Sequence, residues 1–488
     1  MTMIARLGKS ALAMCLAMTP FAVSAQTKIE FFFPVPVEGK LAREMTRLVK
    51  LYNESQKEVE VTAVYTGGYD DTKLKAQAAA KAGKPPAVVL MSANFNVDLK
   101  LSGDIMSLEP FLAAEQTTRD AYLQDFWPAL HANAVVDGAL YGVPFHNSTP
   151  LLYYNVDHFK EAGLDPSKPP RTWAELADTA KKLTKGDRHG FLMPSGYDYL
   201  GWLMEALSMS NGGRYFNEEY GGEVYYDQPS MLGAARFVED LIFKHKVMPQ
   251  GVTEAGGVST AFFAGKASMV LLSTGSLSFI RENMKQGYDV AFVPRNVRNA
   301  VPIGGASLVM FNGQSEDSRK AGWKFIKWLT SAETLGGWSR FTGYFAPRKS
   351  AYDKPEMKEF IARNPDAKVA LDQLPFAKPW FATYQTVAVR KALEDEIQAM
   401  MNGKNEGRRG DLTDCGLAEE YEVLRDILDP LSMPVYLVPG NHDRRAELMA
   451  EFGSDGYLPT DGGFLHYDAR GPGEAAGTRL AARQTTVP

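Results

Sequence analysis

Ser273 follows an apolar run at 268–272 and opens the hydroxyl-rich stretch 273–276. The apolar run predicts a buried strand, and the residues after it predict a helix. A serine at such a junction can present its hydroxyl and neighbouring backbone N–H groups to an anion at the positive end of the helix. The plain alternative is that Ser273 caps the helix, and one residue can do both.

Arg390 is a second candidate for anion chemistry, on a predicted helix around 387–400. Its guanidinium is planar and carries a permanent charge, so it can contact two oxygens of one phosphate, a geometry that lysine cannot copy. Taken alone, an arginine on such a helix is more often a surface residue. The local sequence does not choose between the two interpretations.

The elements that must position these residues alternate between strands and helices. Strands are expected at 28–33, 59–65 and 86–91, with helices at 40–53 and 71–81 between them. In the helix at 40–53, one face collects Leu41, Met45, Leu48 and Tyr52. The alternation indicates an α/β fold with helices layered on a mainly parallel sheet.

Further helices follow along the chain. Thr172 and Glu175 have the spacing of a capping box and predict a helix start. A long amphipathic helix is expected at 230–244, and another helix at 320–330. The expected core positions of the first are Leu232, Ala235, Phe237 and Leu241.

Composition narrows the class of protein. A chain of 488 residues predicts two or three domains, and 45% hydrophobic with 23% charged residues suits a large folded core. A formal net charge of −5 gives no support to nucleic-acid binding. Two cysteines exclude a disulfide scaffold.

Residues 1–25 have the composition of a signal peptide. Arg6 and Lys9 precede an apolar run, and Val23-Ser24-Ala25 offers a cleavage site that leaves Gln26 first. The run is too short to span a bilayer comfortably, which argues against a membrane anchor. The sequence predicts an exported protein that is not inserted in the membrane after cleavage.

The stretch from about 27 to 403 resembles the extracellular solute-binding proteins of bacterial ABC importers, and within them the glycerol-3-phosphate binders. The resemblance rests on ordered motifs: Tyr-Thr-Gly-Gly-Tyr at 65–69, Pro-Phe-His-Asn-Ser-Thr-Pro at 144–150, Ala-Gly-Leu-Asp-Pro at 162–166, Gly-Gly-Ala-Ser at 304–307 and Thr-Gly-Tyr at 342–344. It implies a type II fold of two α/β lobes that close on a ligand. It also implies a periplasmic location, an ABC permease and ATPase complex as partner, no cofactor and no catalytic residues.

The resemblance assigns roles to seven residues. Tyr69, Ser148 and Tyr344 match positions that donate hydrogen bonds to phosphate or glycerol oxygens. For Arg390 the match favours the ligand-binding interpretation, with the guanidinium on two phosphate oxygens, whereas Ser273 stays a candidate anion contact, a helix cap or both. Trp202, with Tyr197 nearby, matches a region whose indole packs on the ligand, and Gly305 matches a position where backbone approaches the ligand.

One position departs from the family. The glycerol-3-phosphate binders carry a glutamate after the third strand, where the present chain has Ala93, followed by Asn94. An alanine cannot accept hydrogen bonds from glycerol hydroxyls. A glycerophosphodiester therefore becomes a candidate ligand beside sn-glycerol 3-phosphate. A sugar is a third candidate, which would follow if Arg390 faced solvent.

The C-terminal part resembles the calcineurin-like metallophosphoesterases. Asp411 in Gly-Asp-Leu-Thr-Asp and Asn441-His442 in Gly-Asn-His-Asp match two motifs of that family. The family's upstream Asp-x-His motif is missing, as are its further histidine motifs, and Asp411 and Asn441 cannot hold two metals by themselves. We therefore expect an incomplete site, no bound metal and no enzyme activity. The alternative is a glycerophosphodiesterase built on these motifs.

These observations predict four segments: a signal peptide at 1–25, a two-lobed binding domain at 26–404, a partial phosphoesterase-like segment at 405–470, and a disordered tail at 471–488.

Overall fold

The computed structural model describes residues 26–35, 40–197, 199–217, 224–404, 418, 421–422, 424–425 and 445–455. The predicted signal peptide, the tail motifs at Asp411, Asn441 and His442, and the predicted tail at 471–488 lie outside the described residues. The chain forms two compact units, Met1–Asn402 and Gly403–Pro488.

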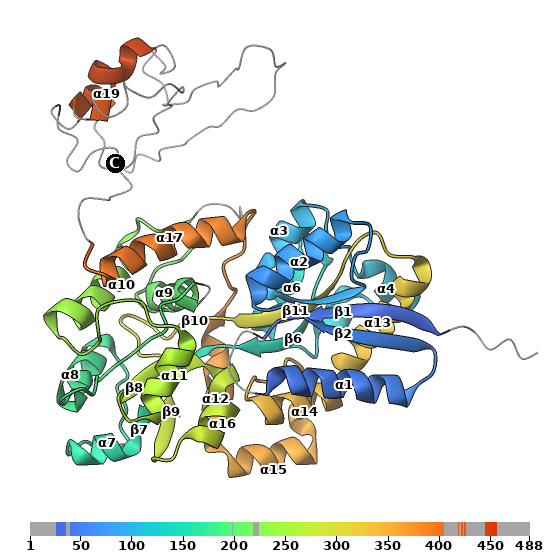
Figure 1. Cartoon of the computed structure of the whole chain (residues 1–488), viewed down its shortest axis with the longest axis horizontal. Helices are drawn as coiled ribbons and strands as arrows, with labels where there is room; N and C mark the ends of the chain where they lie inside the picture. The colour runs from blue at the N-terminus through green and yellow to red at the C-terminus, as the bar shows by residue number, and fades with distance from the viewer. Residues whose placement is uncertain are drawn as a thin grey trace, which may run out of the picture. The chain divides into compact units, whose positions relative to one another are not determined.

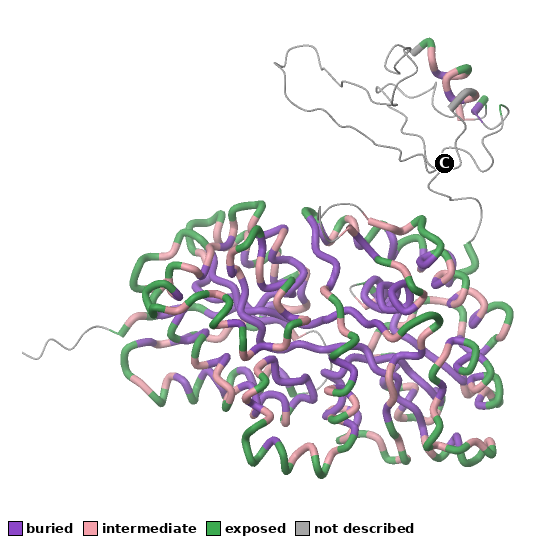
Figure 2. Tube along the Cα trace, turned by 180° about the vertical axis from the view of Figure 1, so that it is seen from behind, coloured by how far each residue is buried: buried purple, intermediate pink, exposed green. Residues whose placement is uncertain are grey.

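The first unit contains two lobes, each with its own buried apolar core. In Figure 1 the lobe built on β1 and β2 lies on the right and the lobe built on β7 and β8 on the left. Figure 2 shows buried backbone running through the centre of both lobes. The first lobe combines residues from the N-terminal third with a later segment of the chain.

The first lobe is built on a five-stranded sheet of order β2-β1-β3-β11-β6. β1 pairs in parallel with β2 and β3, whereas β11 is antiparallel to both β3 and β6. The strands are β1 (Thr27–Phe33), β2 (Val59–Tyr65), β3 (Val88–Ser92), β6 (Val143–Ser148) and β11 (Gly304–Met310).

The expectation of a mainly parallel sheet is right for β1 to β3 and wrong for β11. β6 leaves the first lobe at Ser148, and β11 returns to it at Gly304, which is the register partner of Ser148. A strand that re-enters a sheet where its neighbour left must run in the opposite direction.

Helices cover both faces of this sheet (Figure 1). In α1 (Leu41–Ser55), the predicted face is confirmed, because Leu41, Met45, Leu48 and Tyr52 are all buried. The other helices of this lobe are α2 (Tyr69–Lys81), η1 (Ala93–Phe95), α3 (Asn96–Leu101), α4 (Glu109–Ala114), α5 (Arg119–Leu123), η2 (Pro128–Leu130), α6 (His131–Ala134), α13 (Glu316–Leu329), α14 (Ala332–Thr342), η5 (Lys349–Asp353) and α15 (Pro355–Arg363), with a small hairpin of β4 (Val135–Val136) and β5 (Ala139–Leu140).

The second lobe contains a three-stranded antiparallel sheet of order β8-β7-β9. Only Thr149 separates the end of β6 from the start of β7 (Pro150–Asn155), so at this crossing a single residue connects the two sheets. The other elements are β8 (Met269–Ser273), β9 (Tyr288–Ala291), the pair β10 (Val301–Pro302) and β12 (Ala377–Lys378), α7 (Val156–Glu161), α8 (Trp173–Leu183), α9 (Tyr199–Ser210), α10 (Pro229–Glu239), η3 (Asp240–Lys244), α11 (Ala255–Phe263), η4 (Thr274–Ser276), α12 (Leu277–Asn283), α16 (Pro365–Gln373), η6 (Leu374–Phe376) and α17 (Thr386–Met401).

Two local predictions in this lobe have different outcomes. The capping box is confirmed, because the Thr172 hydroxyl accepts a hydrogen bond from the Glu175 amide and the Glu175 carboxylate accepts one from the Thr172 amide. The helix predicted at 230–244 is present, but its last part, from Asp240, is π-helical rather than α-helical.

The expected core face of this helix is confirmed except at Leu232. Leu241 is buried, and Ala235 and Phe237 are partly buried against the core, whereas Leu232 is 44% exposed. The other buried apolar positions are Met231, Ala234 and Val238. The half-buried Phe237 stacks on Trp173 of α8, with ring centroids 4.5 Å apart. The helix carries apolar residues on more than one side, so periodicity alone could not show that Leu232 faces solvent.

In the second unit, the described residues include α19 (Arg445–Phe452) and η7 (Gly453–Asp455). Arg425 donates to the Glu451 carboxylate and lies over the Phe452 ring. Among the described residues of the chain, the structure contains no helix with the length and apolar character needed to cross a membrane.

Candidate ligand-binding cleft

A pocket of about 150 Å³ lies between the two lobes of the first unit. The first lobe contributes residues from α2, β6, β11 and the loop after α14. The second lobe contributes residues from α9, α11, β8 and the segment before α17. The lining residues are Tyr69, Ser148, Tyr197, Tyr199, Trp202, Glu254, Ala255, Ser273, Gly304, Gly305, Tyr344 and Trp380.

Six of the seven residues that the sequence singled out line this pocket, and Tyr197 lines it as well. Arg390 does not. The six are Tyr69, Ser148, Trp202, Ser273, Gly305 and Tyr344.

Sequence reasoning did not single out Tyr199, Glu254, Ala255, Gly304 and Trp380. Gly304 belongs to the Gly-Gly-Ala-Ser motif at 304–307, so the sequence could have indicated its place in the site. Trp380 lies in a segment whose local pattern does not reveal where it packs.

Two adjacent glycines shape the pocket for different reasons. A Cβ on Gly304 would lie 2.7 Å from the indole ring of Trp202, so this glycine makes room for the indole. Gly305 has φ +95°, and a Cβ there would lie 2.0 Å from the backbone oxygen of His146. The resemblance implied that Gly305 lets the ligand approach the backbone. The structure shows a further requirement for glycine at this position, the close approach of β6.

A stack of aromatic rings supports one wall. The Tyr344 ring lies parallel to the His146 imidazole, with centroids 4.7 Å apart, and the His146 ring also stacks on Trp338. The Tyr69 hydroxyl and His146 Nε2 are 3.0 Å apart. Burial lowers the pKa of His146 to about 3, because desolvation disfavours its charged form. The neutral imidazole therefore fixes the Tyr69 hydroxyl without adding charge to the pocket.

The pocket also holds hydrogen-bonding groups with capacity for a ligand. Trp202 is 5% exposed, and its indole N–H has no hydrogen-bond partner among the described residues. The Ser148 hydroxyl likewise makes no hydrogen bond to another described residue. The Ser273 Oγ accepts a hydrogen bond from the Gly275 amide, which leaves its proton available to a ligand. Buried donors without partners are rare in proteins, so this arrangement suits a ligand rich in acceptors.

Arg390 lies behind α9, where a Cβ on Gly201 would be 2.8 Å from its Cγ. Its side chain is 3% exposed, so it does not face solvent. Its Nε donates to the Glu394 carboxylate at 3.2 Å, and Nη2 donates to Asp70 at 2.9 Å. The structure thus pairs this guanidinium with carboxylates from α17 and from α2 of the other lobe.

Glu254 gives the pocket a carboxylate. The residue is exposed, and its side chain makes no hydrogen bond or ion pair with any described residue. The aromatic rings of Tyr197, Tyr199, Trp202 and Trp380 line the same pocket. A carboxylate beside aromatic faces suits a cationic group of a ligand.

Ala93, the position of the missing family glutamate, lies in η1 and is 2% exposed. It is not among the residues that line the pocket. Its neighbour Asn94 is also buried, and the Asn94 Nδ2 has no hydrogen-bond partner among the described residues.

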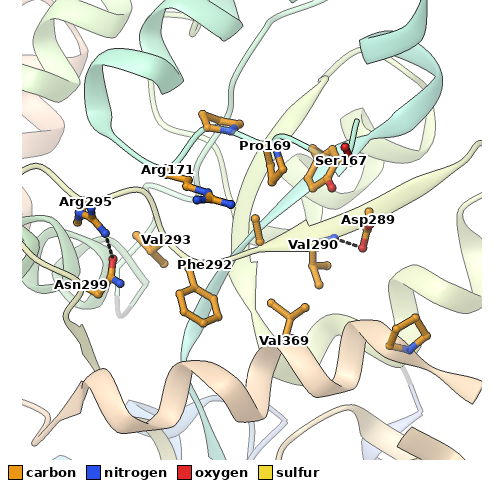
Figure 3. A pocket seen from close by; sticks show the side chains of 14 residues that line it. Ser167, Pro169, Arg171, Asp289, Val290, Phe292, Val293, Arg295, Asn299 and Val369 are labelled. Carbon is orange, nitrogen blue, oxygen red and sulfur yellow. Dashed lines mark hydrogen bonds between the residues drawn. The ribbon is translucent and has the colours of Figure 1, made fainter. Parts of the chain in front are cut away.

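A larger pocket of about 640 Å³ lies elsewhere, entirely within the second lobe (Figure 3). It is bounded by β9, by the loop at 167–171 and by α16, with Arg171 and Phe292 pointing into it (Figure 3). Because its walls belong to one lobe, closure of the two lobes cannot enclose a ligand there. We therefore place the candidate site between the lobes, although that pocket is smaller.

Within the described part of the chain, no group of three or more His, Cys, Asp or Glu side chains is arranged to hold a metal ion. The tail residues Asp411, Asn441 and His442 lie outside the described residues.

Comparison with protein families gives two matches. Residues 47–368 match the bacterial extracellular solute-binding proteins, and residues 409–477 match the calcineurin-like phosphoesterases. Among curated proteins, the sn-glycerol-3-phosphate-binding periplasmic protein UgpB of Yersinia pseudotuberculosis is 28% identical over 82% of this chain and 96% of its own length. UgpB of Escherichia coli O1:K1 is 30% identical over 81% of this chain and 92% of its own length.

Solved structures agree in fold. UgpB from Mycobacterium tuberculosis, in complex with glycerophosphocholine, has a TM-score of 0.69 at 24% identity and covers 84% of this chain and 100% of its own. A solute-binding protein from Thermotoga lettingae, bound with α-D-tagatose, has a TM-score of 0.69 at 20% identity and covers 82% of this chain and 98% of its own. The family match over 47–368, the relatives and the two-lobed fold agree, and the chain belongs to the bacterial extracellular solute-binding proteins.

Proposed function

We propose that this protein is the periplasmic substrate-binding subunit of an ABC importer and that it captures a glycerophosphate-type ligand in the pocket between its lobes. The ligand is sn-glycerol 3-phosphate or a glycerophosphodiester, and the ligand-bound protein delivers it to the membrane permease and its ATPase. The observation that carries the proposal is that six residues chosen from sequence line one interlobe pocket, with the indole N–H of Trp202 buried there without a partner among the described residues.

The chemistry of the pocket supports a phosphate ligand. The hydroxyls of Ser148, Ser273 and Tyr69 can donate to phosphate oxygens, and such hydrogen bonds strengthen when the acceptor is charged. Arg390 does not line the pocket, but it contacts Gly201 and pairs with Asp70, the neighbour of Tyr69, and from there it supplies the positive charge. A sugar would need no arginine at this place, and the burial of Arg390 therefore argues against the sugar alternative.

Glu254 favours a diester with a cationic head group over the free monoester. Its carboxylate has no partner among the described residues and lies beside four aromatic side chains of the same pocket. Glycerophosphocholine carries a quaternary ammonium, which aromatic rings and a carboxylate can hold together. The M. tuberculosis relative of the same fold was solved with this compound.

Isothermal titration calorimetry of the full chain tests the proposal with three ligands: sn-glycerol 3-phosphate, glycerophosphocholine and maltose. We expect the two phosphates to bind and maltose not to bind. Trp202→Ala is expected to weaken phosphate binding strongly, whereas Trp328→Ala, a half-buried tryptophan of the first lobe, is the matched control. Binding of maltose alone would overturn the proposal.

We also propose that the four segments have separate roles: 1–25 directs export, 26–404 binds ligand, 405–470 is a partial phosphoesterase-like segment without activity, and 471–488 is a disordered tail. The support for an inactive segment is the incomplete motif set around Asp411, Asn441 and His442. Two-metal phosphodiester hydrolysis needs more ligands than these residues provide.

A further inference from the structure

Arg390 forms an ion pair that crosses between the lobes. Its Nη2 donates to the Asp70 carboxylate at 2.9 Å, and the two residues are 320 positions apart in the chain. Asp70 lies in the first turn of α2, next to Tyr69, whose side chain lines the pocket. The carboxylate therefore contacts the guanidinium beside the pocket.

The second carboxylate partner of Arg390 has a different setting. Glu394 is fully buried on the same helix as Arg390, and it also accepts a hydrogen bond from the Gly201 amide at 3.0 Å. Glu394 therefore moves with Arg390 and holds it within one lobe. The Asp70 side chain is 38% exposed and belongs to the other lobe, and its Oδ1 has no partner among the described residues.

We infer that Asp70 is a specificity-determining residue, which competes with the ligand phosphate for Arg390 and disfavours phosphate monoesters relative to diesters. The inference rests on the proposed function, because it concerns how the same site chooses among phosphate ligands. The Asp70 carboxylate accepts a hydrogen bond from the Arg390 guanidinium, and a ligand phosphate would need the same donor group.

Charge explains the preference. Among the described residues, Arg390 carries one positive charge and its carboxylate partners Asp70 and Glu394 carry one negative charge each, so these three side chains sum to one negative charge. A phosphate monoester carries close to two negative charges at neutral pH, and a diester carries one. Repulsion by the Asp70 carboxylate is proportional to the ligand charge, so the monoester loses more affinity.

Asp70→Asn in the full chain tests the inference by calorimetry at about pH 7.5. The amide keeps the size of the side chain and removes its charge. We expect affinity for sn-glycerol 3-phosphate to rise about tenfold and affinity for glycerophosphocholine about threefold, in line with one charged hydrogen bond. Asp178→Asn, an exposed residue on α8, is the control for a charge change and should alter neither affinity.

The outcomes separate the two proposals. If the wild type binds either phosphate and Asp70→Asn gains no affinity, or gains equally for both ligands, the inference is wrong and the proposed function stands. A loss of affinity for both ligands would show that the Arg390–Asp70 ion pair only stabilises the contact between the lobes. That result would also overturn the inference. If neither protein binds either phosphate, the proposed function itself is wrong. Asp70→Ser, with unfolding curves recorded for every variant, gives a second removal of the carboxylate and should reproduce the shift.

Discussion

At the scale of single residues, the buried guanidinium of Arg390 combines a structural contact with the proposed ligand contact. Glu394 is fully buried beside it, so removal of the arginine would leave a buried carboxylate without that partner. Such a loss typically costs about 3–5 kcal/mol of folding stability. A change in affinity at this position therefore has to be read together with a change in stability.

Arg390→Lys tests the proposed phosphate contact of Arg390 more directly than Arg390→Ala does. Lysine keeps the positive charge near Glu394 but loses the planar fork, so we expect phosphate affinity to fall about tenfold or more while the protein stays folded. Arg390→Ala is expected to lose most phosphate affinity and also stability. Calorimetry measures the phosphate affinity of the two variants, and urea unfolding measures their stability. Unchanged phosphate affinity in the folded lysine variant would contradict the role of Arg390.

His146 predicts a pH effect on stability. Burial lowers the pKa of the folded-state imidazole to about 3, below its ordinary value of 6.5. The unfolded chain therefore binds a proton that the folded chain excludes, so stability falls as pH drops from about 6.5 towards 3, by up to about 1.4 kcal/mol per pH unit. His146→Gln should remove this contribution while the amide can still reach the Tyr69 hydroxyl. Urea unfolding at pH 7 and pH 4.5 checks it, and an equal pH dependence in both proteins would contradict it.

At the scale of elements, the pairing of β11 with β6 positions the floor of the pocket. Gly304 is the register partner of Ser148, and Gly305 that of Asn147, so both glycines lie where the chain crosses between lobes. Gly304 faces the indole of Trp202, whereas Gly305 faces the β6 backbone. Substitution at the two positions should therefore have different consequences.

Gly305→Ala is expected to destabilise the fold by about 3 kcal/mol, because φ +95° is strained for alanine and its Cβ would meet the backbone oxygen of His146. Gly304→Ala should displace the Trp202 ring and reduce ligand affinity with a smaller loss of stability. Unfolding curves and calorimetry on both variants separate the effects. The reverse order of stability loss would contradict this account of β11.

At the scale of the whole molecule, the binding lobes and the C-terminal segment belong to different compact units, which divide between Asn402 and Gly403. The described residues that line the pocket, and the carboxylates described as partners of Arg390, all precede this division. Ligand binding should therefore not depend on the C-terminal unit.

A chain that ends at Lys404 is expected to bind sn-glycerol 3-phosphate or glycerophosphocholine within about twofold of the full chain, since no pocket residue is removed. The full chain is expected to show no hydrolysis of glycerophosphocholine with added Mn²⁺. Chromatographic detection of glycerol 3-phosphate checks the second point. Hydrolysis that Asp411→Ala abolishes would show that the segment is an active enzyme.

The sequence by itself determined the features that depend on neighbouring residues. The buried face of α1 followed from apolar residues at helical spacing, and the start of α8 from the Thr172–Glu175 capping box. Both depend on backbone geometry within a few residues, which the sequence displays directly. The α/β class followed from the alternation of strands and helices, and the family from ordered motifs along the chain. On α10 only Leu232 was misjudged, because the helix carries apolar residues on several sides and the sequence did not show which of them faces solvent.

Only the tertiary structure decided which distant residues meet. The reversed direction of β11 follows from its return out of the second lobe, and no local pattern records that return. Glu254 and Trp380 lie in the pocket because α11 and the segment before α17 pack around it. The pairing of Arg390 with Asp70 joins positions 320 residues apart in different lobes. Such contacts depend on how whole elements pack, because the free energy of bringing two lobes together is shared by many residues rather than carried by a local motif.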